Sequence, residues 1–433
     1  IQSYNHTGAS CGAPPHEAAF SLCFHFLAPA SMSLRLRASL RPLSILATVA
    51  LLSAAVLLGG STSSVPVDAA VEKAHAERLK GLASRYEHRL AEGLRKGLPV
   101  RADGFAYAID LGNVMSAAVA LDNRPLFDRA YGMIREHFLR TDTKDAQARH
   151  TVVWRYEPRT APDASGAKET GVLADALWEA YERWGHPPHR EMAKTVLDAY
   201  LRHGYWETDR RFVVKNYYNY GTQALSESTW VLNQMPHAVR KIACGTRDSS
   251  LFRHARGMAQ FATRAYLKKG FSREMYDRGI ETVFDGADGY YSPNGLLKLQ
   301  SSLEIARSVL PFDPTPARKI VEFIGERAPD VYSSYYYNPR SETIAPLAET
   351  SEQAYALSER ALALSLATRV RGSLGEDGLR DFVSREIVPV LKKRSDKTFS
   401  TFYFEVPLVL KAIQRYLQPQ DPPGSAGESG CDV

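Results

Sequence analysis

The chain has 433 residues, with 54 Lys and Arg against 48 Asp and Glu, a formal charge of +6 and 44% hydrophobic residues. This composition is that of an ordinary globular protein, and it excludes an intrinsically disordered chain, a collagen and a protein with many membrane spans. The basic residues are spread along the chain without a long run, so we expect no nucleic-acid partner.

The amino-terminal part predicts export. Residues 1–31 have neither helical nor strand periodicity and are interpreted as upstream sequence outside the fold. Met32 is followed by Arg35, Arg37 and Arg41 and then by an uncharged, mostly apolar stretch that ends near Gly60. This order is typical of a signal peptide or of a single membrane anchor within 32–64, and the sequence leaves both open. In either case we expect the rest of the chain outside the cytoplasm, as a periplasmic, membrane-anchored or secreted protein.

From residue 65 to residue 418 almost every stretch has the period of an amphipathic helix. Two kinds of helix alternate. Helices with one charged face are expected at 71–90, 130–138, 190–203, 250–268, 315–326 and 377–393. Helices with few charges and many small residues are expected at 105–121, 168–183, 222–242, 292–310, 346–370 and 402–417.

This alternation predicts an all-α fold, an (α/α)6 toroid in which the low-charge helices form an inner ring and the charged helices an outer ring. An open solenoid is the rival architecture. Solenoid repeats usually span about 34 to 47 residues, whereas the low-charge helices here begin 54 to 70 residues apart, which favours the closed ring. The tail 419–433 is rich in Pro, Gly and Ser and is expected to be disordered.

In such a ring the segments that lead into the inner helices gather at one end. Aromatic, carboxylate and amide side chains recur at these positions. Sugar faces stack on aromatic rings while carboxylates and amides bind hydroxyl groups, so the pattern indicates a carbohydrate site. Packing and helix capping explain any one of these residues equally well, but not their recurrence in six repeats. The candidate substrate-binding residues are Trp154, Tyr156, Asn219, Tyr220, Tyr291 and Tyr336.

Residues 112–131, 153–155 and 167–185 resemble the layout of the family-eight glycoside hydrolases, the bacterial endoglucanase and chitosanase group. In that family the glutamate that acts as the catalytic acid begins the first inner helix, a few residues before a Tyr-Gly-Met. The resemblance implies an (α/α)6 toroid, with Asp110 near the acid and Glu169 in the place of the cleft aspartate. The family's Ser-Glu-Gly is absent here and its base has no clear counterpart. The candidate catalytic residues are therefore Asp110, Glu169, Glu227 and Asp288.

The segment Asn219-Tyr220-Gly221-Thr222 is similar to the Asn-His-Gly-Thr of some toroidal alginate lyases. This second resemblance implies an alternative activity, a polysaccharide lyase in which Tyr220 takes a proton and Asn219 neutralises the uronate carboxylate. A non-catalytic toroid that binds a glycan or a protein is a further alternative.

The sequence contains no nucleotide-binding, nucleophile-elbow or zinc-protease motif, so we expect no cofactor and no metal. The nearest His pair, His186 and His189, falls in a turn. The main hypothesis is an exported glycoside hydrolase that acts on an extracellular or cell-envelope polysaccharide through carboxylate acid/base catalysis. The sequence does not define the oligomeric state.

Overall fold

The computed structural model describes residues 67–278, 289–292, 295–327, 335–338, 343–346, 356–370, 374–394 and 401–418. The expected signal or anchor segment and the expected disordered tail lie outside these ranges. The described residues belong to one compact unit that begins at Pro66. Within this part of the chain no helix has the length and apolar character needed to cross a membrane.

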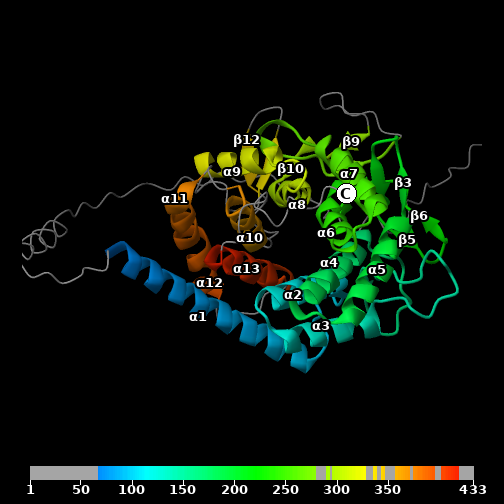
Figure 1. Cartoon of the computed structure of the whole chain (residues 1–433), viewed down its shortest axis with the longest axis horizontal. Coiled ribbons are helices and arrows are strands. Elements are labelled where there is room, and N and C mark those ends of the chain that lie inside the picture. The colour runs from blue at the N-terminus through cyan, green and yellow to red at the C-terminus, as the bar shows by residue number, and fades with distance from the viewer. Residues whose placement is uncertain are drawn as a thin grey trace, which may run out of the picture. The chain divides into compact units, whose positions relative to one another are not determined.

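Within the described residues, six helices form a closed inner ring, shown in Figure 1. Each helix packs against the next, and the last returns to the first. This closure confirms the (α/α)6 toroid and excludes the open solenoid. The inner helices are α2 (Ala108–Ala120), α4 (Ala167–Trp184), α6 (Pro236–Thr246), α8 (Leu299–Val309), α10 (Ala356–Ala367) and α13 (Phe402–Leu417).

The outer ring consists of the helices with one charged face. The pairs α2 with α3, α4 with α5, α6 with α7 and α8 with α9 each join an inner helix to the outer helix that follows it. The sixth outer element is divided by the π-helical turn Val383–Ile387. The outer helices are α1 (Val67–Lys96), α3 (Arg124–His137), α5 (Pro187–Arg202), α7 (Ser249–Thr263), α9 (Thr315–Arg327), α11 (Gly375–Phe382) and α12 (Val388–Arg394).

Helix α4 shows how the sequence produces an inner helix. It begins after Gly166 and ends at Gly185, whose φ of 67° closes the helix in the left-handed conformation that glycine adopts without strain. Leu173, Ala174 and Leu177 are fully buried between neighbouring helices. Small residues on such a helix allow close packing on several sides, which is what membership of the inner ring requires.

Short antiparallel strand pairs join the segments that precede successive inner helices. For example, β1 (Ala106–Tyr107) pairs with β2 (Arg155–Tyr156), and a single bridge joins Ala164 to Asn219. The inner helices therefore present their amino termini at the same end of the ring. The other strands are β3 (Gly204–Trp206), β4 (Phe212–Val214), β5 (Tyr218–Asn219), β6 (Ala224–Leu225), β7 (Thr229–Trp230), β8 (Met275–Tyr276), β9 (Tyr290–Tyr291), β10 (Leu297–Lys298), β11 (Tyr335–Asn338) and β12 (Thr343–Pro346).

Three inner helices begin later than the periodicity predicts. The helices expected from residues 222, 292 and 346 start at Pro236, Leu299 and Ala356. For α6 the reason is local, because Thr229 and Trp230 favour the strand that they form and Pro236 fits only the first turn of a helix. The predicted number and order of the inner helices are correct. Short strands occupy part of the predicted first turns of α6 and α8, whereas residues 347–355, before α10, lie outside the described residues.

Candidate active site at the amino-terminal end of the inner ring

Glu169 lies in the first turn of α4, three residues after the N-cap residue Gly166. Its carboxylate folds back over the helix end and accepts a hydrogen bond from its own backbone N–H. The carboxylate lies so close to Gly166 that a Cβ added there would be 1.8 Å from Oε2. Part of the side chain remains exposed to solvent.

The pKa of Glu169 is raised from 4.5 to about 7, and burial among protein atoms is the largest cause. The negative charge of Asp110 acts in the same direction, whereas Lys168, Arg101 and the backbone N–H favour the charged form. Burial outweighs the helix terminus, which by itself would lower the pKa. The pKa of Glu169 thus lies near neutral pH, in the range that suits a general acid.

Asp110 is 1% exposed and is bound by Arg101, whose Nε and Nη2 donate to the two carboxylate oxygens at 2.9 and 2.5 Å. Burial raises the pKa of Asp110 and the guanidinium of Arg101 opposes that shift. The guanidinium also lies 4.3 Å from the ring centroid of Tyr107. Asp110 therefore holds Arg101 in place beneath the aromatic side chain.

Asp103 is an exposed carboxylate at the same end of the ring. It accepts hydrogen bonds from the Phe105 N–H at 3.1 Å and from the Tyr107 hydroxyl at 2.7 Å. Its charge contributes to the raised pKa of Asp110, so the two carboxylates interact. The predicted set did not include Asp103. The sequence signal for Asp103 is its position beside Tyr107 and Asp110 at the start of the first inner helix.

An aromatic and cationic surface borders these carboxylates. Arg155 lies between two rings, 4.3 Å from the centroid of Phe105 and 4.4 Å from that of Trp154. The Trp154 indole N–H donates to Asp163 at 2.9 Å, and Arg155 forms an ion pair with the same carboxylate at 3.1 Å. Trp154 also meets the Tyr107 ring edge to face, with centroids 5.8 Å apart. Asp163 thereby fixes the orientation of both Trp154 and Arg155.

Tyr156, Asn219 and Tyr220 are engaged in contacts of the fold. The ring of Tyr156 packs against His137 and Phe138 at the end of α3. The Asn219 side-chain oxygen accepts hydrogen bonds from the backbone N–H groups of residues 221 and 222, both at 2.9 Å. The hydroxyl of Tyr220 lies 3.1 Å from that of Thr151, and burial raises the pKa of Tyr220 to about 12.

The remaining predicted residues are spread more widely. Glu227 is exposed in the loop between β6 and β7, where its backbone carbonyl accepts a hydrogen bond from Lys215. Tyr291 lies in β9, opposite Met275. The backbone of Tyr336 lies in β11, opposite that of Lys298, but its side chain is outside the described part of the structure, and so is all of Asp288.

Two further carboxylates occupy the first turns of α10 and α13. Glu405 is fully buried and accepts hydrogen bonds from the Ser358 N–H at 3.3 Å and the Thr401 hydroxyl at 3.2 Å. Glu359 is 4% exposed, and burial raises its pKa to about 8, with the charge of Glu405 acting in the same direction. Sequence reasoning did not single out Glu359, because periodicity alone treats it as one more helical position.

An ion pair links two inner helices beside Glu169. Lys168 Nζ lies 2.8 Å from Glu304 of α8 and also donates to the Leu232 carbonyl at 3.0 Å. Among the described residues, no group of three or more His, Cys, Asp or Glu side chains is arranged to hold a metal ion. The described side chains at this end of the ring are carboxyl groups, Lys168, arginines and aromatic rings.

Comparison with known proteins shows which solved structures the toroid is similar to. No family model and no curated protein matches the chain. A reducing-end-xylose releasing exo-oligoxylanase is similar over 80% of this chain and 92% of its own, with a TM-score of 0.55 and 16% identity. The fold is therefore similar to that of the family-eight glycoside hydrolases, as the sequence resemblance implied.

Two other solved structures are similar at the same level. A variant of Rex8A from Paenibacillus barcinonensis, complexed with 3(3)-alpha-L-arabinofuranosyl-xylotetraose, has a TM-score of 0.52 and 16% identity, covering 78% of this chain and 94% of its own. An alpha-amylase from Clostridium perfringens has a TM-score of 0.53 and 15% identity, covering 72% and 87%. At identities this low, the similarity establishes a shared fold and nothing more.

Proposed function

We propose that the chain is an exported glycoside hydrolase that cleaves an extracellular or cell-envelope polysaccharide, with Glu169 as the proton donor. The observation that carries the proposal is the Glu169 carboxyl group at the amino terminus of an inner helix, where burial raises its pKa to about 7. A glycosidic oxygen needs a proton as its bond to the sugar breaks, and a carboxyl with a pKa of about 7 supplies one at neutral pH. The proposal of export rests on the pattern of residues 32–64.

The second carboxylate of the reaction is Asp103 in this proposal. It is exposed, and it interacts with Asp110, which in turn interacts with Glu169. Asp110 is less suited to this role because the guanidinium of Arg101 binds both of its carboxylate oxygens. The deprotonated carboxylate would activate water or attack the anomeric carbon while Glu169 protonates the leaving oxygen. Glu227 and Asp288 stay as sequence-based candidates for the same role.

Trp154, Tyr107 and Arg155 support a sugar substrate. Aromatic faces stack on the C–H surface of a sugar ring, and a guanidinium donates to its hydroxyl groups. The solved structures of similar fold include complexes with xylose and with a substituted xylotetraose. Xylo-oligosaccharides are therefore the first substrates to test.

The lyase alternative gains no support from the site geometry. A tyrosine base needs a lowered pKa, whereas burial raises that of Tyr220 to about 12. The Asn219 oxygen is occupied by the backbone N–H groups of its own turn. The proposal therefore rests on the carboxylates near α2 and α4.

The test is reducing-end release from a panel of neutral and acidic oligosaccharides, including xylo-oligosaccharides, by the parent and three variants. Glu169→Gln and Asp103→Asn are each expected to lower kcat by at least about 100-fold without any loss of thermal stability. Glu157→Gln changes an exposed carboxylate beside β2 and is expected to retain parental activity. A parent that binds but cleaves no member of the panel, or a Glu169→Gln variant at the parental rate, would overturn the proposal.

A further inference from the structure

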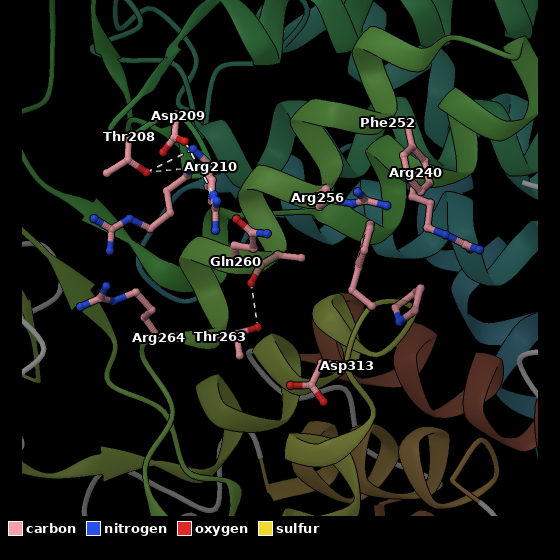
Figure 2. A pocket seen from close by; sticks show the side chains of 14 residues that line it. Thr208, Asp209, Arg210, Arg240, Phe252, Arg256, Gln260, Thr263, Arg264 and Asp313 are labelled. Carbon is pink, nitrogen blue, oxygen red and sulfur yellow. Dashed lines mark hydrogen bonds and ion pairs between the residues drawn. The ribbon is translucent and has the colours of Figure 1, made fainter. Parts of the chain in front are cut away.

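A strongly basic cavity lies beside the outer helix α7. It has a volume of about 1070 Å³ and is formed by one face of α7, Arg240 of α6, the turn between β3 and β4, and the residues that follow α8 (Figure 2). None of the residues of the proposed catalytic group lines it. Cavities of this size hold ligands larger than a single ion.

Helix α7 provides the floor of the cavity through one stripe of side chains. Phe252, Arg256, Gln260 and Arg264 are spaced four residues apart, so they lie on the same face of the helix. Figure 2 shows these side chains along the helix, with Arg210 facing the stripe from the β3–β4 turn. The fold brings arginines from three segments, the β3–β4 turn, α6 and α7 with its C-cap, to one place without any run of basic residues.

The positive charge of the cavity is incompletely neutralised. Five arginines line it against two aspartates, Asp209 and Asp313. Arg211 is paired with Glu207 at 2.6 Å. In the part of the chain that the structure describes, Arg240 and Arg264 form no ion pair. Guanidinium groups of like charge repel one another, and this repulsion destabilises the folded protein. An anionic ligand in the cavity would reduce the repulsion.

Aromatic groups accompany the arginines. The rings of Phe252 and Phe312 lie 6.3 Å apart, and Arg256 lies 5.4 Å from the Phe252 centroid. Gln260 and Thr208 add uncharged hydrogen-bonding groups. Small inorganic anions need no aromatic surface, whereas a sugar ring that carries an anionic group uses both the rings and the guanidinium groups.

We propose that this cavity binds a segment of an acidic polysaccharide, in which carboxylate or sulfate groups on the sugars pair with Arg240, Arg256 and Arg264. The inference rests on the proposed glycan-directed function, but it concerns binding and not cleavage. An anchoring site on the outer helices would keep an acidic chain near the protein while another segment of it reaches the inner ring. Arg–carboxylate and Arg–sulfate contacts of this kind are bidentate and sensitive to salt.

The test is binding measured by titration calorimetry on the Glu169→Gln background, so that turnover does not interfere. The probes are oligogalacturonate, dextran sulfate, neutral xylo-oligosaccharide, inorganic phosphate, single-stranded DNA and anionic phospholipid vesicles. Oligogalacturonate or dextran sulfate should bind, and Arg256→Gln/Arg264→Gln should weaken that binding at least tenfold. The matched control is Arg129→Gln/Arg253→Gln, which removes two exposed arginines outside the cavity and should bind like the parent.

Each outcome decides the proposal. Tighter binding of DNA, vesicles or phosphate than of the acidic sugars would overturn it, as would an equal loss in the control. The two acidic probes tell a carboxylate ligand from a sulfate ligand. With Glu169 intact, the cavity variant should cleave neutral substrate at the parental rate. Acidic-glycan binding without any hydrolysis would refute the proposed function and leave the cavity assignment standing, whereas hydrolysis without such binding would refute the cavity assignment alone.

Discussion

Arg101 binds both oxygens of the buried Asp110 carboxylate, with Nε and Nη2 at 2.9 and 2.5 Å. The same guanidinium lies 4.3 Å from the Tyr107 ring centroid and lowers the pKa of Glu169 against the effect of burial. Asp110 thus acts on the site through Arg101 as well as through its own charge. This geometry favours a positioning role for Asp110 and leaves Glu169 and Asp103 as the groups available to a substrate.

Asp110→Asn tests that positioning role. Removing one partner of a buried ion pair leaves an uncompensated charge, so we expect the free energy of unfolding to fall by about 3 kcal/mol. Activity should fall as well, because Arg101 loses its fixed position beneath Tyr107. Urea unfolding and kcat measured on the same preparations check both effects.

The matched control for Asp110→Asn is Asp128→Asn. Asp128 pairs with Arg124 at 3.6 Å on the exposed face of α3. Such a pair contributes at most about 1 kcal/mol. Equal destabilisation by the two substitutions would show that the Arg101 pair has no special importance for the fold.

Gly166→Ala tests the position of the Glu169 carboxylate without changing any charge. The added methyl group would lie 1.8 Å from Oε2 and 3.0 Å from the Trp154 Cβ, so the carboxylate must move. The backbone of Gly166, with φ of −107°, suits alanine, and we expect a change in unfolding free energy below about 1.5 kcal/mol. Turnover should nevertheless fall at least about 10-fold, since displacing a catalytic group by an ångström costs that much or more.

The control for this substitution is Gly221→Ala. Its added methyl group would meet only the Asn219 side-chain oxygen, at 3.4 Å. This variant should turn over substrate at close to the parental rate. Unchanged activity of Gly166→Ala would mean that the carboxylate of Glu169 is not needed where the structure places it.

The sequence predicted the ring because two periodic signals reinforce each other. Low-charge and charged helices alternate along the whole domain, and burial follows the same alternation. The starts of α6, α8 and α10 were placed too early, since a run of uncharged residues such as Thr229 and Trp230 fits a buried helix as well as a strand. Strand pairing between distant segments decides between them, and that information is not local.

The site was predictable to a different degree. Glu169 could be selected because its place in the first turn of an inner helix follows from the helix boundaries. The raised pKa could not, since it depends on burial by residues from other helices. Asp103 and Asp110 are seven residues apart in the sequence. Only the fold shows that Tyr107 binds Asp103 and that Arg101 binds Asp110.

Glu179 provides a further prediction, because it is the common partner of two lysines from different inner helices. Its Oε1 lies 2.9 Å from Lys241 Nζ of α6, and its Oε2 lies 2.9 Å from Lys411 Nζ of α13. Burial lowers the pKa of Lys411 to about 8, and the charge of Glu179 opposes that shift. Glu179→Gln should lower the free energy of unfolding by about 3 to 5 kcal/mol, as expected when a buried charge loses its partner.

The comparison for Glu179→Gln is Glu182→Gln, one turn further along α4. Glu182 accepts a hydrogen bond from the Trp178 indole at 2.7 Å, which the Gln side-chain oxygen can replace. We expect this substitution to cost less than about 1 kcal/mol. Denaturant unfolding of both variants measures the two effects. If Glu182→Gln were the more destabilising substitution, Glu179 would not be the important shared partner of Lys241 and Lys411.

The pH dependence of Glu169 links activity to stability. The ordinary pKa of a glutamate is 4.5, whereas that of Glu169 in the folded chain is about 7. The folded chain therefore binds the carboxyl proton of Glu169 more tightly than the unfolded chain does. The resulting cost to stability is absent well below pH 4.5, grows as the pH rises to about 7 and is constant above that. The upper limit is about 3 kcal/mol at 1.36 kcal/mol per pKa unit, reduced by the solvent contact of the side chain. Glu169→Gln should therefore gain stability relative to the parent between pH 5 and pH 8 in urea unfolding.

In the parent, kcat for glycoside hydrolysis should fall above a midpoint near pH 7, because the proton donor is lost there. A parental rate that is flat from pH 6 to pH 9, together with an unfolding difference that does not change with pH, would exclude Glu169 as the acid.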